Sequence, residues 1–152
     1  MDPSEGFHVV VGVEGSAESR RALEWAVTEA RLRQGHVTAV TAWESPAVTA
    51  GMEGVIWDPT SFEMAARNEQ ARALDRVRAD DIAITGLVIS GAPARVLLDA
   101  SKDADLLVVG SRGLGGFSGL LLGSVSAQLV HHATIPVLVV RPRQAAPQRL
   151  LS

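Results

Sequence analysis

Apolar residues follow two alternating patterns along the chain: short continuous runs, and longer stretches with apolar positions three or four residues apart. The short runs are rich in β-branched residues and predict five strands, at 7–13, 36–43, 82–90, 105–110 and 136–140. The longer stretches predict four helices, at 17–34, 59–80, 94–102 and 124–133. Strict alternation of strand and helix predicts an α/β fold, a doubly wound parallel sheet with helices on both faces.

Capping and turn residues mark where these elements begin and end. Ser16 stands at the N-cap position of the first helix, and Gly35 is a natural stop for it. Proline and glycine within 44–58 predict a long loop. The chain contains no internal repeat and no sign of a second domain, so we expect one domain over 1–152 with a frayed tail over about 144–152.

The charge and composition of the chain narrow the function classes. A net charge of −3, with basic residues scattered over 152 residues, argues against nucleic acid and against a membrane surface as partners. The absence of cysteine excludes disulfides, thiolate metal sites and a cysteine nucleophile. The acidic start MDPSEGF and the short apolar run after it match neither a signal peptide nor a membrane span, which favours a cytoplasmic protein.

A glycine-rich segment, GSRGLGGFSGLLLGS at 110–124, follows the most hydrophobic run of the chain, and six of its fifteen residues are glycine. Glycine loses much conformational freedom on folding, so such a cluster usually serves a close backbone approach or a positive φ. Its leucines and Phe117 are too apolar for a solvated tether. The segment ends in Gly123-Ser124 at a predicted helix start, where free N–H groups and the helix dipole favour an anion. We interpret it as a phosphate-binding loop.

Two common phosphate-binding motifs are absent from this segment. A P-loop requires GxxxxGK followed by Ser or Thr, but the one lysine, Lys102, lies upstream in another predicted helix. A dinucleotide motif GxGxxG beginning at Gly113 would need glycine where the chain has Ser118.

The spacing Gly110-x2-Gly113-x9-Gly123-Ser124 resembles the nucleotide motif of the ATP-binding branch of the universal stress protein family, G-x2-G-x9-G-(S/T). The segments VVVGVEGSAESRRALEWAV and ATIPVLVVRP are similar to that family's opening and closing segments, so the resemblance covers nearly the whole chain. It implies a Rossmann-like, open five-stranded parallel sheet of order 3-2-1-4-5. The loops after the first and fourth strands would then face one crevice.

The resemblance also implies roles for particular residues. Gly110 and Gly113 would let the backbone pass close to the ribose and phosphates, and the helix start would hold the phosphates. Ala39, Val40 and Thr41, near the end of the second predicted strand, would lie against adenine, and Val11 and Gly12 would line the floor of the site. The full candidate set is Val11, Gly12, Val13, Glu14, Val40, Gly110, Ser111, Arg112, Gly113, Gly123, Ser124, Val125 and Ser126.

Glu14 departs from the family pattern, in which nucleotide-binding members usually carry aspartate in a V-D-G-S turn. The added methylene moves the carboxylate by about 1.5 Å. A buried polar group that is moved away from its hydrogen-bond partner costs about 1–3 kcal/mol. We therefore expect weaker or altered nucleotide binding as much as a complete loss of binding. The ligand expected is ATP, or ADP or AMP, with Mg²⁺ as a candidate companion ion.

Three functions remain open from the sequence. The first is a stress-response regulatory module that binds an adenine nucleotide. The second is a slow ATP hydrolase or transferase using the same cleft, and the third is an interaction module whose nucleotide binding is weakened by Glu14.

Arg112 has a planar guanidinium that could bind phosphate oxygens, and a solvated loop arginine without a ligand is an equal alternative. We expect no metal at His131-His132, because adjacent helix positions point apart. The resemblance implies a homodimer through the last strand, Val137–Val140.

Overall fold

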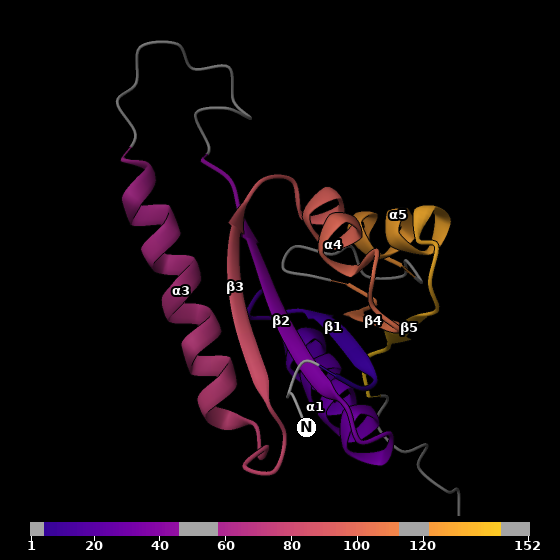
Figure 1. The fold of residues 1–152 in the computed structure, drawn as a ribbon. Coiled ribbons are helices and arrows are strands. Elements are labelled where there is room, and N and C mark those ends of the chain that lie inside the picture. The colour runs from indigo at the N-terminus through magenta and orange to yellow at the C-terminus, as the bar shows by residue number, and fades with distance from the viewer. Residues whose placement is uncertain (1–4, 46–57, 113–121, 144–152) are drawn as a thin grey trace, which may run out of the picture.

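The computed structural model describes residues 5–45, 58–112 and 122–143, and everything below concerns these ranges. They form a three-layer α/β domain in which strands and helices alternate (Figure 1). In chain order the elements are β1 (His8–Gly12), α1 (Ala17–Leu32), β2 (His36–Trp43), α3 (Pro59–Arg76), β3 (Ile84–Ser90), α4 (Pro93–Ser101), β4 (Leu106–Gly110), α5 (Ser124–His132) and β5 (Val137–Val140). All five predicted strands and all four predicted helices are present.

The sheet is parallel throughout and has the strand order β3-β2-β1-β4-β5. This confirms the predicted fold class and strand order. β1 lies at the centre, where Val10 pairs with Thr38 of β2 on one side and Leu107 of β4 on the other. The chain winds outward from β1 to β3 and then returns to place β4 and β5 on the opposite side, so the winding reverses between β1 and β4.

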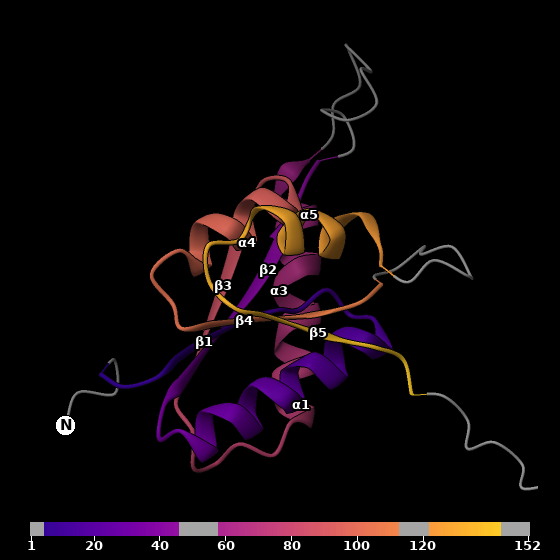
Figure 2. The same ribbon diagram turned by 90° about the vertical axis from the view of Figure 1, so that its right-hand side faces the viewer.

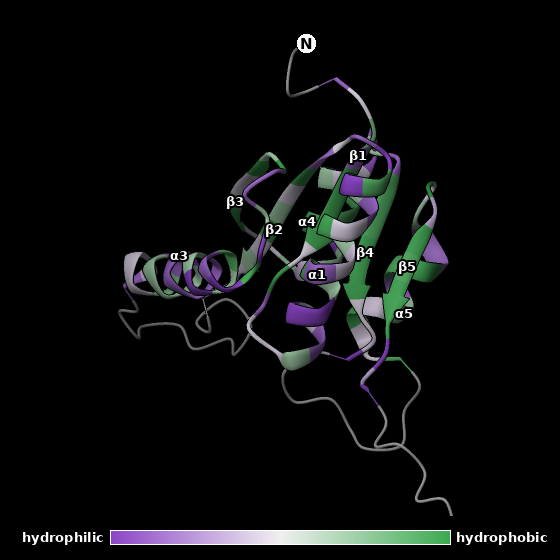
Figure 3. Ribbon diagram, turned by 90° about the horizontal axis from the view of Figure 1, so that it is seen from below, coloured by the Kyte–Doolittle hydropathy of each residue, from purple (hydrophilic) through white to green (hydrophobic). Residues whose placement is uncertain are grey.

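Helices cover both faces of the sheet, with α4 and α5 above it and α1 below it in Figure 2. Alternate residues of β1 enter different cores. Val9 and Val11 pack with α1 and α3, whereas Val10 packs with α4 and α5. All three valines are fully buried, which explains why β1 reads as a continuous apolar run instead of an alternating one. From below, the hydrophobic character of β4 and β5 stands out against the mixed surface of α3 (Figure 3).

Helix α3 ends at Arg76, four residues before the predicted end, and β3 begins at Ile84 instead of residue 82. Val77 adopts an extended conformation, with φ −84° and ψ 138°. The side chains of Val77, Ala79 and Ile82 all pack against the core under α1. An irregular connection brings these three apolar groups to one surface, whereas a continued helix would distribute them by its own periodicity.

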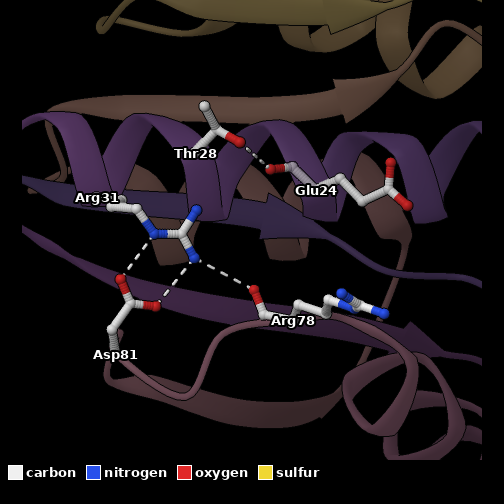
Figure 4. Close-up of polar contacts among 5 residues, drawn as sticks. All are labelled: Glu24, Thr28, Arg31, Arg78 and Asp81. Atoms are coloured by element: carbon white, nitrogen blue, oxygen red, sulfur yellow. Dashed lines mark hydrogen bonds and ion pairs between the residues drawn. The ribbon is translucent and has the colours of Figure 1, made fainter.

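Arg31 fastens the end of α1 to this connection (Figure 4). Its Nε and Nη2 donate to the two carboxylate oxygens of Asp81 at 2.7 and 2.9 Å, and Nη2 also donates to the carbonyl of Arg78 at 3.2 Å. The hydrogen bonds from Arg31 lower the pKa of the Asp81 carboxyl. Both side chains are about half exposed, so the pair orients the connection more than it stabilises the domain.

Two histidines stack at the amino-terminal edge of the sheet. The rings of His8 and His36 lie 4.5 Å apart with an interplanar angle of 14°. His8 Nε2 makes a 2.8 Å hydrogen bond with the Thr38 hydroxyl, and its main-chain N–H donates to Asp105 Oδ2 at 2.8 Å. Burial, and next the neighbouring His36, lower the pKa of His8, and the Asp105 carboxylate opposes them.

The lowered pKa of His8 gives the stability of the domain a defined pH dependence. The ordinary His8 pKa is 6.5, and the folded value lies below it, so the unfolded chain takes up this proton first as pH falls. The stabilising contribution is therefore complete above about pH 6.5 and is lost as pH falls through the folded pKa. We expect His8→Gln to flatten the decrease in unfolding free energy between about pH 7.5 and pH 5.

Urea unfolding at several pH values would measure this effect, with His131→Gln on the exposed end of α5 as the matched control. The control should keep the pH dependence of the natural chain. Equal slopes for the natural chain and His8→Gln would show that His8 does not carry the effect.

Candidate nucleotide-binding site

The carboxyl ends of β1 and β4 meet where the winding of the sheet reverses, the position at which open α/β sheets bind ligands. The structure brings together here the turn after β1, the first residues after β4 and the start of α5. Of the predicted site residues, Gly113 lies outside the described ranges. The others can be placed individually.

The turn after β1 is a closely hydrogen-bonded unit. Val13 donates its N–H to the carbonyl of Val40 at 2.9 Å, so the turn is attached to β2. Ser16 caps α1 as predicted, because its hydroxyl accepts the Ser19 N–H at 3.1 Å. Glu14 Oε1 accepts the Ser16 N–H at 3.1 Å. The carboxylate of Glu14 therefore folds back onto its own turn, at the positive end of the α1 dipole.

Gly15 within this turn has a φ of +93°, a conformation that residues with a side chain adopt only with strain. A Cβ atom at this position would lie 2.5 Å from Glu69 Oε1 of α3. The turn is thus covered by a side chain from another layer. The sequence shows the glycine, but it does not show the carboxylate that covers it.

Ser111 joins the two described ends of the glycine-rich segment. Its N–H donates to the carbonyl of Val140 in β5 at 2.8 Å. Its carbonyl accepts two short hydrogen bonds, from the Gly123 N–H and from the Ser126 hydroxyl, both at 2.6 Å. One carbonyl oxygen therefore fixes the start of α5 beside the end of β4. We call this arrangement the Ser111 junction.

The start of α5 is open at its first turn. Gly123 is the N-cap and provides no side-chain hydrogen bond to the helix. The amides of Ser124, Val125 and Ser126 begin the helix and have no acceptor within it, because the first N–H groups of any helix lack an intrahelical carbonyl. Ser124 is exposed and Val125 is half-buried. This end of α5 therefore has the free N–H groups that an anion site requires, and phosphate binding here stays a prediction.

Ser126 has a more specific role than the phosphate contact expected of it. Its side chain is 3% exposed, and its hydroxyl donates to Ser111 O at 2.6 Å and approaches Gly123 O at 3.1 Å. A hydroxyl has a single proton, so a contact with phosphate through this donor would break the bond to the main chain. Ser126 positions the start of α5, and that role was not predicted.

The side chain of Ser111 is a buried polar group without a hydrogen-bond partner among the described residues. Ser111 is fully buried, and its Oγ has no hydrogen-bond partner among the described residues. A buried hydroxyl without a partner costs about 1–3 kcal/mol. Such a group within a candidate site is a natural place for a polar ligand atom.

Gly110 is required by packing against α1, and its predicted approach to a ligand stays a prediction. A Cβ at Gly110 would lie 2.8 Å from the Cβ of Glu18 and 3.0 Å from its carbonyl carbon, in the first turn of α1. Gly12 has a similar explanation, since its Cβ would lie 3.1 Å from Leu97 Cδ1 of α4. Both glycines bring a helix close to a strand end. Helices of both faces thereby reach the edges of the crevice.

The apolar residues predicted to line the site contribute to the core. Val11 and Val13 are buried with α1, and Val40 is buried on the side of α4. Their contribution to the crevice comes from main-chain groups at the strand ends. Arg112 is half-buried at the start of the glycine-rich segment, directly after Ser111.

Ala39 and Thr41, expected beside adenine, instead face α3. The buried side chain of Gln70 donates from Nε2 to Ala39 O at 3.1 Å, to the Thr41 hydroxyl at 3.0 Å and to Leu87 O at 2.9 Å. A buried glutamine in an amphipathic helix has no distinctive sequence signal, so Gln70 was not predicted.

Within 5–45, 58–112 and 122–143, no three His, Asp or Glu side chains lie close enough together to hold a metal ion. No helix of these ranges is long and apolar enough to cross a bilayer.

Comparison with known proteins agrees with this geometry. The profile of the universal stress protein family matches residues 7–141. The universal stress protein Rv2623 of Mycobacterium tuberculosis is 39% identical over 134 residues, which cover 88% of this chain and 44% of that protein. The chain thus spans less than half the length of the curated relatives that it matches.

Two solved structures in this family contain an adenine nucleotide. A universal stress protein in complex with cAMP is 31% identical, with a TM-score of 0.63, and the match covers 92% of this chain and 100% of that one. The universal stress protein from Archaeoglobus fulgidus in complex with dAMP has a TM-score of 0.66 at 23% identity, covering 88% and 97%. The strand order, the family match over residues 7–141 and these similarities agree, and the chain belongs to the universal stress protein family.

Proposed function

We propose that this chain binds an adenine nucleotide at the carboxyl ends of β1 and β4 and acts as a regulatory module of the stress response. The observation that carries this proposal is the Ser111 junction, which holds the uncapped start of α5 beside the end of β4. The complexes of similar proteins with cAMP and dAMP support an adenine nucleotide as the ligand.

The phosphates would occupy the start of α5. The amides of Ser124 and Val125 supply N–H donors there, and the helix dipole adds a favourable field for negative charge. The unpartnered hydroxyl of Ser111 supplies a further polar atom next to these donors. Arg112 completes the set with a charged group suited to phosphate oxygens. The base would then extend towards the ends of β1 and β2.

Glu14 bears on which nucleotide binds best. Its carboxylate is held by the Ser16 amide, so its negative charge stays at the same crevice. A polyphosphate without a cation would be repelled by this charge, whereas a monophosphate or an Mg²⁺-bound nucleotide would be repelled less. AMP and Mg²⁺-ATP are therefore the first ligands to compare.

Replacement of the N-cap of α5 tests the site directly. Gly123 has a φ of −74°, which valine adopts without strain, so Gly123→Val should fold while its side chain crowds the first amides. We expect at least about tenfold weaker nucleotide binding, because loss of one charge-assisted hydrogen bond costs about 1.5–3 kcal/mol. Isothermal titration with AMP, ADP and ATP, with and without Mg²⁺, measures the affinity.

Ala127→Val, at an exposed position of the same helix, is the matched control and should bind as the natural chain does.

Nucleotide binding should also stabilise the fold. At a nucleotide concentration of about a hundred times Kd, the unfolding free energy should increase by about 2.7 kcal/mol and Tm should rise by several degrees. Chromatography of the supernatant after denaturation would reveal nucleotide carried through purification. No bound nucleotide and no Tm shift with any of the three at millimolar concentration would rule out the proposal. Phosphate release that Gly123→Val abolishes would show hydrolysis at the same site.

Ser126→Ala separates the positioning of α5 from direct ligand contact. Removing this hydroxyl leaves the start of α5 held by the Gly123 bond alone, and it leaves a buried carbonyl with one partner fewer. We expect a loss of about 1 kcal/mol in unfolding free energy together with weaker nucleotide binding. Ser124→Ala, which removes an exposed hydroxyl, is the control for stability. Unchanged stability of Ser126→Ala would contradict the positioning role.

The same proposal includes a homodimer through β5. This edge strand is hydrophobic along its length (Figure 3). Three of its four residues, Val137, Leu138 and Val139, are only half-buried. An apolar edge strand offers free main-chain groups to a second copy. We expect Val139→Lys to shift the protein from dimer to monomer in light scattering with size-exclusion chromatography, while circular dichroism stays unchanged. A natural chain that is monomeric at micromolar concentration would contradict the dimer.

A further inference from the structure

A groove of about 730 Å³ lies between α4 and the edge strand β3, on the face of the sheet covered by α4 and α5. Its volume is within the range of small-molecule sites. The floor is apolar and includes Leu87, Ile89 and Val96. Leu87 is 39% exposed, although it belongs to the sheet. None of the residues at the start of α5 lines the groove, so it is separate from the nucleotide site.

Two opposite charges on α4 face this groove. Arg95 and Asp99 both line it, and neither forms an ion pair with another residue of 5–45, 58–112 or 122–143. They are four residues apart, which places them about 6 Å apart along the helix axis. A cationic and an anionic group thus stand at two levels of one apolar groove.

The order of these charges is unfavourable for the helix itself. Arg95 is in the first turn of α4 and Asp99 is in its last turn, whereas the helix dipole favours anions at the start and cations at the end. The first turn of α4 has no acidic residue and its last turn no basic one, and the nearest compensating charge is Lys102 at the C-cap. Arg95 and Asp99 are exposed and form none of the ion pairs of the described residues, so both charges are available to an external partner.

The ends of the groove are polar as well. Ser90 and Gly91 lie at the end near Arg95, where α4 begins. The hydrogen-bonded pair of His8 and Thr38 lies at the other end, near the level of Asp99. A ligand that fits must therefore be apolar in the middle, anionic towards the start of α4 and cationic towards its end.

We propose that the groove between α4 and β3 binds a short apolar peptide with both termini free, of dipeptide length. The carboxylate of the peptide pairs with Arg95 and its ammonium group pairs with Asp99. Two extended residues span about 7 Å, close to the rise of about 6 Å between the positions of Arg95 and Asp99 along the helix axis. The side chains of the peptide cover Leu87, Ile89 and Val96.

The test uses L-leucyl-L-leucine and two blocked forms of it, the N-acetyl peptide and the C-terminal amide. Methyl NMR spectra of the natural chain should show saturable shifts at Leu87 and Ile89 with the free peptide. Each blocked form should bind about tenfold more weakly at low ionic strength, because each lacks one charged partner. Equal binding of the three peptides, or no methyl shifts at millimolar peptide, would overturn the proposal.

Charge variants provide the second arm of the test. Arg95→Gln and Asp99→Asn should each weaken binding of the free peptide about tenfold without lowering Tm, since neither residue has an internal partner. The double exchange Arg95→Asp with Asp99→Arg should restore binding to within a few-fold, with the peptide reversed. It should also raise Tm, because the exchanged charges suit the helix dipole. Failure of the double exchange to recover binding would overturn the paired-charge recognition.

Gly123→Val is the control that keeps this site distinct from the nucleotide site. It should leave peptide binding unchanged, whether or not it abolishes nucleotide binding. Loss of peptide binding in Gly123→Val would place the peptide at the other crevice and would overturn the proposal.

Discussion

The candidate nucleotide site depends on one acceptor, the carbonyl oxygen of Ser111. It receives the Gly123 amide and the Ser126 hydroxyl, and the amide of the same residue is bonded to β5. These bonds fix the end of β4, the start of α5 and the neighbouring edge strand relative to one another. A helix start binds an anion well only if its amides are held in place beforehand. The two described ends of the glycine-rich segment therefore meet at one carbonyl oxygen.

The architecture could be predicted from the sequence because it depends on local patterns. Continuous apolar runs predicted strands buried on both faces, and Val9, Val10 and Val11 do enter cores on both sides of the sheet. The N-cap at Ser16 could be predicted because capping is a local interaction. The boundary of α3 could not, since Arg76 and the residues after it continue a helical pattern in the sequence. Packing under α1 decided that boundary.

The meeting of the two loops at the carboxyl ends of β1 and β4 could also be predicted, but the contacts of individual residues there could not. Gly110 was assigned to the ligand from the motif, yet the first turn of α1 already occupies the space beside it. Ser126 was assigned to phosphate, yet its hydroxyl is bonded to the main chain. The partners in these contacts lie far away along the chain. A motif records which residue types stand at a position, and it does not record which neighbour required them.

The attachment of β3 has a consequence for how this domain opens. β3 is an edge strand whose residues are mostly exposed, and its contacts are with β2, α3 and the face beside α4. The Gln70 amide joins α3 to main-chain oxygens of both β2 and β3. The strands β1 and β4, in contrast, are buried at the centre. Partial opening costs least where buried apolar area is smallest. Opening of α3 and β3 would therefore cost less buried apolar area than opening of the centre, and it would uncover the turn after β1, because Glu69 of α3 lies over Gly15.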